Sequence, residues 1–198
     1  ISAGNTGATM GSALLRMGRI KGVKRPAIAT PLPVPSGGHT VLLDAGANAE
    51  CQPQWLVQFA QMGAVFSRER YGIDDPKVGL LSIGEEKSKG TPLVKETNAL
   101  LEAGAWSEVS GGHFIGNVEG RDLMTGEVDV VVTDGFTGNV ALKTMEGLAN
   151  MLVGALKTEY TRNPLRYFGA LTSWPVLRSL RREFDPRTYN GASLVGLT

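Results

Sequence analysis

Short apolar runs that end in glycine and polar residues are the feature that most constrains the fold of this chain. One run covers residues 41–43, and similar runs lie within "KVGLLSIG", "HFIGNVEG" and "DVVVTDG". Between them, apolar residues recur at helical spacing, as at Trp55, Leu56 and Phe59 in the segment 52–72. Buried strands that alternate with helices indicate an α/β fold, with helices flanking a mainly parallel sheet.

Turn-forming residues mark where these elements are expected to end. The segment 31–38, "PLPVPSGG", contains three prolines, so we expect a loop without regular strand pairing. After the run at 128–132, the loop "TDGFTG" is expected to precede a helix that starts at Asn139. A length of 198 residues suits a single α/β catalytic domain, residues 1–198. Because both ends fall inside motifs, we interpret the chain as an interior fragment of a longer protein.

Five predicted strand ends carry glycine together with Asn, Asp, Glu or Lys. They are "SAGNTGA", "LDAGAN", "SIGEEKSKG", "IGNVEGRD" and "TDGFTGN". Ligands of open α/β sheets bind beyond the carboxyl ends of the strands, so we expect these segments to form one rim. Glycine-rich turns that lead into helices, as at 4–11 and 135–139, are typical of anion sites, although helix caps use the same residues.

The rim candidates would act by charge and position. Lys89, Lys95 and Arg121 can neutralise an anion. The amides of Asn5, Asn117 and Asn139 can donate to an anion or a developing oxyanion. Acidic candidates that could orient these groups or accept a proton are Asp44, Glu85, Glu86, Glu119 and Asp134. The plainer interpretation is that these are ordinary surface charges and helix starts.

Several site classes lack support in the sequence. The single Cys51 excludes an internal disulfide and a multi-cysteine metal cluster, and we interpret it as a small buried residue rather than a nucleophile. His39 and His113 are poorly placed for a Ser–His–Asp device. Neither a Walker loop nor a Gly-x-Gly-x-x-Gly fingerprint occurs. We therefore expect no metal, no cofactor and no nucleic-acid partner. A metal site built on carboxylates alone stays open, although no recognisable spacing points to one. No membrane-length apolar run or signal peptide is visible, which predicts a cytoplasmic protein.

Taken together, the motifs resemble a known family. "SAGNTGA", "GRIKGVKRPAIA", "LLDAGAN", "VGLLSIGEEKSKGTPLVKE", "FIGNVEGRD", "VVVTDGFTGNVALKTMEG" and "YNGASLVGL" are similar, in order and spacing, to the bacterial phosphate acyltransferase family PlsX. The resemblance implies a fold like that of phosphotransacetylase and isocitrate dehydrogenase, and a homodimer. It also implies that acyl phosphate is made from acyl-(acyl carrier protein) and inorganic phosphate, for phospholipid synthesis. The family's N-terminal glycine-rich turn and its C-terminal strand and helix are absent from this chain.

The implied chemistry suits the residues of the rim. Phosphate is its own nucleophile, and a thiolate with a pKa of about 8.5 is a good leaving group. We predict Lys89 and Asn139 as the central pair, which would donate to phosphate and to the thioester oxygen. Asn5 and Thr6 would add contacts at a second helix N-terminus, and Arg121 a further positive charge. The remaining candidates for phosphate or substrate binding are Gly7, Asp44, Asn48, Glu85, Asn117, Glu119, Asp134 and Gly138.

The segment 160–184 differs from the rest, and basic residues are concentrated near it. Residues 151–198 hold seven Lys or Arg against three Asp or Glu, a net charge of +4, whereas residues 1–150 hold 13 against 16, a net of −3. We predict a hairpin of two short amphipathic helices with a turn at "TSWP". Phe168, Leu171 and Trp174 would lie near its tip, with Arg178, Arg181 and Arg182 behind.

Three interpretations of this hairpin stay open. It could pack on the dimer or the core, or it could insert its tip at the inner face of the membrane with the arginines on lipid phosphates. Alternatively, the arginines could dock the acidic acyl carrier protein. Rivals for the whole protein are a phosphotransacetylase-like acyl-CoA:phosphate transferase, a dehydrogenase of the related fold, and a non-catalytic scaffold that docks at membranes.

Overall fold

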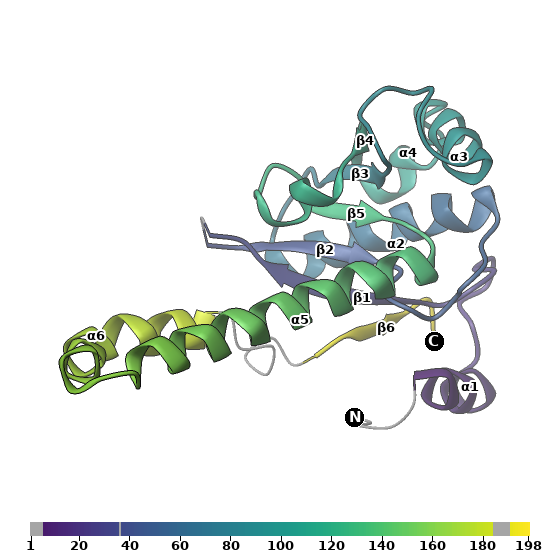
Figure 1. The fold of residues 1–198 in the computed structure, drawn as a ribbon. Helices are drawn as coiled ribbons and strands as arrows, with labels where there is room; N and C mark the ends of the chain where they lie inside the picture. The colour runs from purple at the N-terminus through teal and green to yellow at the C-terminus, as the bar shows by residue number, and fades with distance from the viewer. Residues whose placement is uncertain (1–5, 36, 184–190) are drawn as a thin grey trace. The chain divides into compact units, whose positions relative to one another are not determined.

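The computed structural model describes residues 6–35, 37–183 and 191–198, with the side chains of 6–7 and 181–183 left aside. The chain divides into two compact units (Figure 1). The first comprises Ile1–Asn139 with Ala192–Thr198, and the second comprises Val140–Gly191. The first unit contains the sheet, and the described part of the second is mainly helical.

The first unit is built on a six-stranded sheet in the order β4-β3-β5-β2-β1-β6. The strands are β1 (Ala27–Pro33), β2 (His39–Leu43), β3 (Lys77–Leu81), β4 (His113–Val118), β5 (Val130–Val132) and β6 (Ser193–Val195). The neighbours β2–β5, β5–β3 and β3–β4 are parallel, whereas β1 pairs antiparallel with both β2 and β6. The predicted α/β architecture with a parallel central region is therefore confirmed.

The first unit also contains helical segments before β5, of which α2 packs against the sheet (Figure 1). They are α1 (Thr6–Met17), α2 (Pro53–Tyr71), α3 (Pro92–Glu102), α4 (Ser107–Ser110) and the 3-10 helix η1 (Gly120–Met124). Helix α2 buries Leu56 and Phe59 in the core, and a side chain of that size contributes about 1.5–3 kcal/mol when buried. Gly63 allows a close approach, because a Cβ there would lie 2.5 Å from Cγ1 of Val130 on β5.

The proline-rich segment is partly a strand, so the prediction of an unpaired loop at 31–38 was wrong. Pro31 pairs with Val41 and Pro33 with His39 in the antiparallel β1–β2 ladder. The reason lies on the other side of β1. In the described residues, β6 pairs only with Ala27 to Ala29. The part of β1 that contains both prolines is therefore an edge there, where a missing N–H costs no ladder hydrogen bond.

Two helices follow β5, and both differ from their predicted bounds. Helix α5 (Gly135–Tyr160) begins four residues before the predicted Asn139. Helix α6 (Pro164–Glu183) runs through "TSWP" without a turn, so Phe168, Leu171 and Trp174 lie within a helix and not at a hairpin tip. The actual connection is 161–163, where the Asn163 side chain accepts the Arg166 amide. Asn and Pro at 163–164 start a helix well, whereas Pro175 inside α6 removes one hydrogen bond without ending it.

Candidate functional site

The strand register brings four of the five predicted rim segments to one edge. Leu43 pairs with Val132, Val132 with Leu80, and Leu80 with Asn117. The loops that follow β2, β5, β3 and β4 therefore start side by side at the carboxyl edge of the sheet. The fifth segment lies largely outside the described residues: Asn5 is not described, and Thr6 and Gly7 are described only as the start of α1.

Asp44 organises the first of these loops. Its carboxylate is fully buried and accepts five hydrogen bonds. The donors are the amides of Ile28, Gly46, Ala47 and Asn48 and the Asn48 side chain, at 2.7–3.2 Å. A carboxylate held in this way is satisfied internally. The structure thus gives Asp44 a positioning role for the loop 44–48 and leaves its oxygens no room for substrate.

Asn48 joins this loop to its neighbours. Its Nδ2 donates to the carbonyl of Pro26 at 2.8 Å and to Asp44, and its own carbonyl accepts the amide of Gly135 at 2.8 Å. The side chain is 7% exposed. Asn48 was predicted to contact substrate, but its amide nitrogen is occupied by these two acceptors. It connects the start of β1, the loop after β2 and the start of α5.

The two glycines of "DGFTG" permit close packing of the α5 N-terminus. A Cβ on Gly135 would lie 2.6 Å from the Asn48 carbonyl oxygen, and one on Gly138 only 1.9 Å from the Asp44 carbonyl oxygen. Asp134 caps the helix, because its carboxylate accepts the Thr137 amide at 2.9 Å and the Thr137 hydroxyl at 2.7 Å. The amide of Gly138 donates to the Asp134 carbonyl. Most amides of this turn are therefore engaged within the protein.

Asn139 differs from its neighbours in being exposed. Its side chain lies over Gly46, where a Cβ would come within 3.4 Å of Asn139 Cβ and Oδ1. Gly46 adopts a φ of 132°, which is open to glycine alone in practice. The Asn139 side chain is thus exposed beside the bare backbone of the 44–48 loop. Its role as a donor to substrate stays a prediction.

The loops after β3 and β4 form a second cluster. Asn117 is buried and fully used: its Nδ2 donates to the Glu86 carbonyl at 3.0 Å, and its Oδ1 accepts from Asn98 at 2.9 Å. It fixes the loop 82–90 rather than contacting a ligand. Lys89 lies in that loop with an exposed side chain. No ion pair within the described part of the chain involves Lys89.

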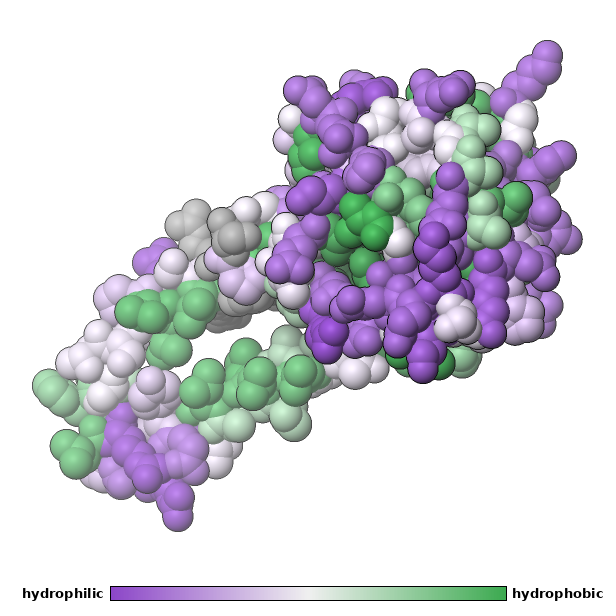
Figure 2. All heavy atoms as spheres, turned by 90° about the horizontal axis from the view of Figure 1, so that it is seen from above, coloured by the Kyte–Doolittle hydropathy of each residue, from purple (hydrophilic) through white to green (hydrophobic). Residues whose placement is uncertain are grey.

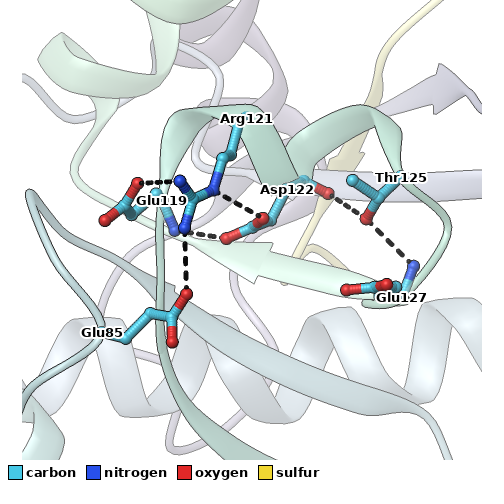
Figure 3. Close-up of polar contacts among 6 residues, drawn as sticks. All are labelled: Glu85, Glu119, Arg121, Asp122, Thr125 and Glu127. Carbon is cyan, nitrogen blue, oxygen red and sulfur yellow. Dashed lines mark hydrogen bonds and ion pairs between the residues drawn. The ribbon is translucent and has the colours of Figure 1, made fainter.

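Arg121 is surrounded by carboxylates (Figure 3). Its guanidinium lies 3.1 Å from Glu85, 3.4 Å from Glu119 and 3.7 Å from Asp122. Glu119 first, with help from Glu85 and Asp122, raises the pKa of Arg121. Glu119 and Asp122 also form a reciprocal capping box for η1. An anion at Arg121 would have to compete with these carboxylates, of which Glu85 alone is exposed, so the positive charge predicted there is already balanced.

The structure therefore arranges the candidates in two clusters. Asp44, Asn48, Asp134, Gly138 and Asn139 meet at the β2 and β5 ends, and Glu85, Lys89, Asn117, Glu119 and Arg121 gather at the β3 and β4 ends. Across the described residues, no hydrogen bond or ion pair joins a candidate of one cluster to one of the other. The pairing of Lys89 with Asn139 stays a prediction.

Cys51 and both histidines are unsuited to nucleophilic catalysis at this edge. Burial raises the pKa of the Cys51 thiol from 9.0 to about 12, against the smaller opposing effect of a backbone hydrogen bond from Gly135. His39 is the first residue of β2 and His113 the first of β4, so both lie at the opposite, amino edge. Burial lowers the pKa of His39, which stacks on Tyr71 with ring centroids 4.7 Å apart.

Metal clusters and membrane-spanning helices are both absent from the described residues. Among them, no group of three or more His, Cys, Asp or Glu side chains could hold a metal ion. Likewise, none of the helices there combines the length and apolar character needed to cross a bilayer.

A basic groove next to the carboxyl edge was not predicted. It is a hollow of about 630 Å³ lined by Arg19, Lys24, Arg25, Gln52, Gln54 and Trp55. The guanidinium carbon of Arg25 lies 4.9 Å from the centroid of the Trp55 ring. The signal that could have revealed it is local charge. Residues 1–43 contain five Lys or Arg and no Asp or Glu, an imbalance hidden by the net −3 of residues 1–150.

Comparison with known proteins decides the family. The family model described as fatty acid synthesis protein matches residues 1–198. This chain belongs to that family. It is 54% identical, over 197 residues, to a protein named phosphate acyltransferase from Elusimicrobium minutum (strain Pei191), and 50% identical over 196 residues to one from Paracidovorax citrulli (strain AAC00-1). These alignments include 100% and 98% of this chain but 56% of each relative. The chain thus spans about half the length of the curated relatives it matches.

Solved structures support the fold. The EutD phosphotransacetylase from Staphylococcus aureus matches with a TM-score of 0.57 at 23% identity, covering 75% of this chain and 49% of that protein. A phosphotransacetylase from Streptococcus pyogenes matches with a TM-score of 0.53 at 18% identity, covering 74% and 49%. The predicted phosphotransacetylase-like α/β fold is confirmed, and these similarities speak to the fold alone.

Proposed function

We propose that this chain forms part of a phosphate acyltransferase, which makes acyl phosphate from acyl-(acyl carrier protein) and inorganic phosphate for phospholipid synthesis. The observation that supports this most is the carboxyl edge of the sheet. It holds an exposed lysine, Lys89, and an exposed amide donor, Asn139, in a chain 54% identical to a protein of that name. Both side chains can donate to anionic oxygen. Lys89 extends from a loop that the buried Asn117 holds in place, and Asn139 extends from the first turns of α5, which pack on the 44–48 loop.

The proposed reaction needs positioning and charge but no protein nucleophile. A phosphate oxygen attacks the thioester carbonyl, a C–O bond forms, and the C–S bond breaks as the tetrahedral intermediate collapses. The thiol leaves as thiolate and takes a proton from solvent. Lys89 would neutralise the phosphate, and Asn139 would donate to the oxyanion of the intermediate. The raised pKa of Cys51 keeps its thiol protonated, which favours direct attack by phosphate over an acyl-enzyme.

Single substitutions of the two exposed donors test this proposal. Lys89→Ala and Asn139→Ala are each expected to lower kcat by about 10²–10³, the cost of removing one oxyanion donor, with unchanged thermal stability. Acyl phosphate formed by the full-length protein would be trapped with hydroxylamine. Lys157→Ala and Asn150→Ala, both on α5, replace exposed residues of the same types and should leave kcat unchanged.

Two results would contradict the proposal. Normal turnover in both Lys89→Ala and Asn139→Ala would remove these residues from the mechanism. Product from acyl-CoA but none from the acyl carrier protein would favour the phosphotransacetylase-like alternative, because the two reactions share their chemistry and differ in the thiol.

The second unit supports a peripheral membrane association of a cytoplasmic enzyme, which we propose as an additional property. Helix α6 exposes Leu165, Phe168, Leu171 and Trp174 by 80, 64, 58 and 60%. Arg178 follows them on the same helix. Figure 2 shows apolar side chains gathered over the α5 and α6 segments. An apolar helix surface with basic residues suits the boundary of an anionic membrane.

Exposed apolar side chains on α5 support the proposed homodimer. Leu148, Met151, Leu152 and Val153 are each more than half exposed. Monomeric proteins rarely leave contiguous apolar surface of this kind uncovered, so a second copy is the proposed cover for part of α5. Light scattering of the full-length protein would give the oligomeric state directly.

A further inference from the structure

The basic groove has no role in the acyl transfer described so far. Its six lining residues include three cations, Arg19, Lys24 and Arg25, and no acid. None of the ion pairs among the described residues involves these three cations. The acidic residue nearest to the groove in sequence is Glu50, which is exposed. The positive potential of the groove is therefore not balanced by an ion pair of its own.

The loop that carries these cations is held in one conformation. Gln58 of α2 clamps it from both sides: its Oε1 accepts the Lys24 amide at 2.8 Å, and its Nε2 donates to the Gly22 carbonyl at 2.9 Å. The Arg19 guanidinium donates to the Lys24 carbonyl. Arg25 lies over the Trp55 ring, a cation–π contact. The side chains of Arg19 and Arg25, held in this way, lose little freedom when a partner binds.

The groove is connected directly to the carboxyl edge of the sheet, which is the reacting edge in the proposed function. The residue after Arg25 is Pro26, whose carbonyl accepts from Asn48 Nδ2 at 2.8 Å. Asn48 in turn accepts the Gly135 amide at the start of α5. Gln52 and Gln54 continue from the same 44–48 loop into α2. A partner seated in the groove would therefore lie beside the loop over which Asn139 is placed.

We propose that the basic groove is the docking surface for the acidic carrier protein that delivers the acyl thioester. The inference rests on the proposed acyl transfer. Charge complementarity favours an acidic protein, and two features favour a protein over a lipid surface. The cations line an open hollow, which a convex protein surface follows more closely than a flat bilayer does. Their position next to the reacting edge also suits the delivery of a substrate.

Charge reversal in the full-length protein tests the proposal. Lys24→Glu/Arg25→Glu is expected to weaken binding of the unacylated carrier protein at least about tenfold at low salt, and to flatten the dependence of binding on salt. It should raise the KM for acyl-carrier protein to a similar extent, with kcat and the KM for an acyl-pantetheine thioester unchanged. Arg70→Glu/Lys77→Glu makes the same charge change at the amino edge and should alter none of these quantities.

The binding and kinetic arms separate the two proposals. The charge-reversed variant could lose carrier binding while the unsubstituted protein forms no acyl phosphate from any thioester. That result would retain the docking surface and overturn the proposed function. Acyl transfer with unchanged carrier affinity in the charge-reversed variant would overturn the docking surface and retain the function. Unchanged carrier affinity with lost binding to phosphatidylglycerol vesicles would assign the groove to lipid instead. Lys24→Arg/Arg25→Lys keeps the charge and should retain most of the carrier affinity, which a merely structural role of the two residues would not predict.

Discussion

At Gly138 the backbone of α5 touches the loop after β2 so closely that no side chain fits. A Cβ would lie 1.9 Å from the Asp44 carbonyl oxygen. Gly138→Ala is therefore expected to lower the free energy of unfolding by about 3 kcal/mol through overpacking, although alanine is otherwise the better helix former. Denaturant unfolding of the full-length protein measures this change.

The same helix contains a matched control. Gly147 has open space around its Cβ position. Gly147→Ala should raise stability by about 0.5–1 kcal/mol, the usual difference between the two residues within a helix. Equal effects of the two substitutions would contradict the view that Gly138 is required by contact with the 44–48 loop.

Cys51 offers a test of the burial around that loop. With its pKa raised from 9.0 to about 12, the thiolate fraction in the folded protein at pH 8 should be about a thousandfold lower than in the unfolded chain. Since the chain has one cysteine, thiolate-specific labelling reports on this site alone. The labelling rate of the folded protein should keep rising above pH 9, where that of the denatured chain levels off.

The same shift makes stability depend on pH. Above about pH 9 the unfolded chain loses the thiol proton while the folded protein keeps it, so the free energy of unfolding falls as the pH rises toward 12. Cys51→Ser should remove this component of the fall. Labelling of the folded protein at pH 8 within tenfold of the denatured rate would contradict the buried, protonated thiol.

At the scale of elements, periodicity predicted the sheet and its helices well. The apolar runs at 41–43 and 128–132 became β2 and β5 because strands buried on both faces need continuous apolar residues. Two predictions that rested on proline were wrong. Pro31 and Pro33 lie in a strand, and Pro175 lies inside a helix. A proline in a strand is tolerated when its nitrogen faces an unpaired edge, and a proline in a helix is tolerated when the remaining hydrogen bonds hold the helix together. The residues next to the proline in sequence reveal neither condition.

The site was predicted at the level of loops but less well at the level of side chains. The strand-end rule placed Asp44, Asn117 and Asp134 at the correct edge. Their hydrogen bonds show them holding loops and caps instead of facing a ligand. An aspartate buried among five hydrogen-bond donors and an exposed catalytic aspartate cannot be told apart in the sequence. Only their three-dimensional contacts distinguish them.

At the scale of the whole molecule, charge is distributed in patches that averages conceal. The first 43 residues contain only positive charges, whereas residues 44–150 hold 8 Lys or Arg (13 − 5) against 16 Asp or Glu. Residues 151–198 carry a second basic excess, and a docking role was predicted from the sequence for it alone. The groove at Arg25 and the α6 surface are therefore two separate candidates for contact with acidic partners, one in each compact unit.

The α6 surface leads to a prediction about membrane binding. Leu171→Glu and Trp174→Glu are each expected to weaken binding of the full-length protein to phosphatidylglycerol vesicles by about tenfold or more, since a buried side chain of this size contributes roughly 1.5–3 kcal/mol. Val109→Glu is the matched control, because Val109 is also an exposed apolar residue and lies on α4 in the first unit. Co-sedimentation with vesicles gives the affinities.

The competing role of α6 predicts a different pattern. If α6 packs against a second copy of the chain, Leu171→Glu should shift the oligomeric state in light scattering while vesicle binding stays normal. If α6 inserts into lipid, vesicle binding should fall while the oligomeric state is unchanged. The salt dependence then separates the contributions: apolar insertion persists at high salt, whereas attraction of Arg178 to lipid phosphate is screened over about 10 Å at 0.1 M salt. A vesicle affinity that disappears entirely at high salt in the unsubstituted protein would exclude insertion and leave charge alone as the attraction.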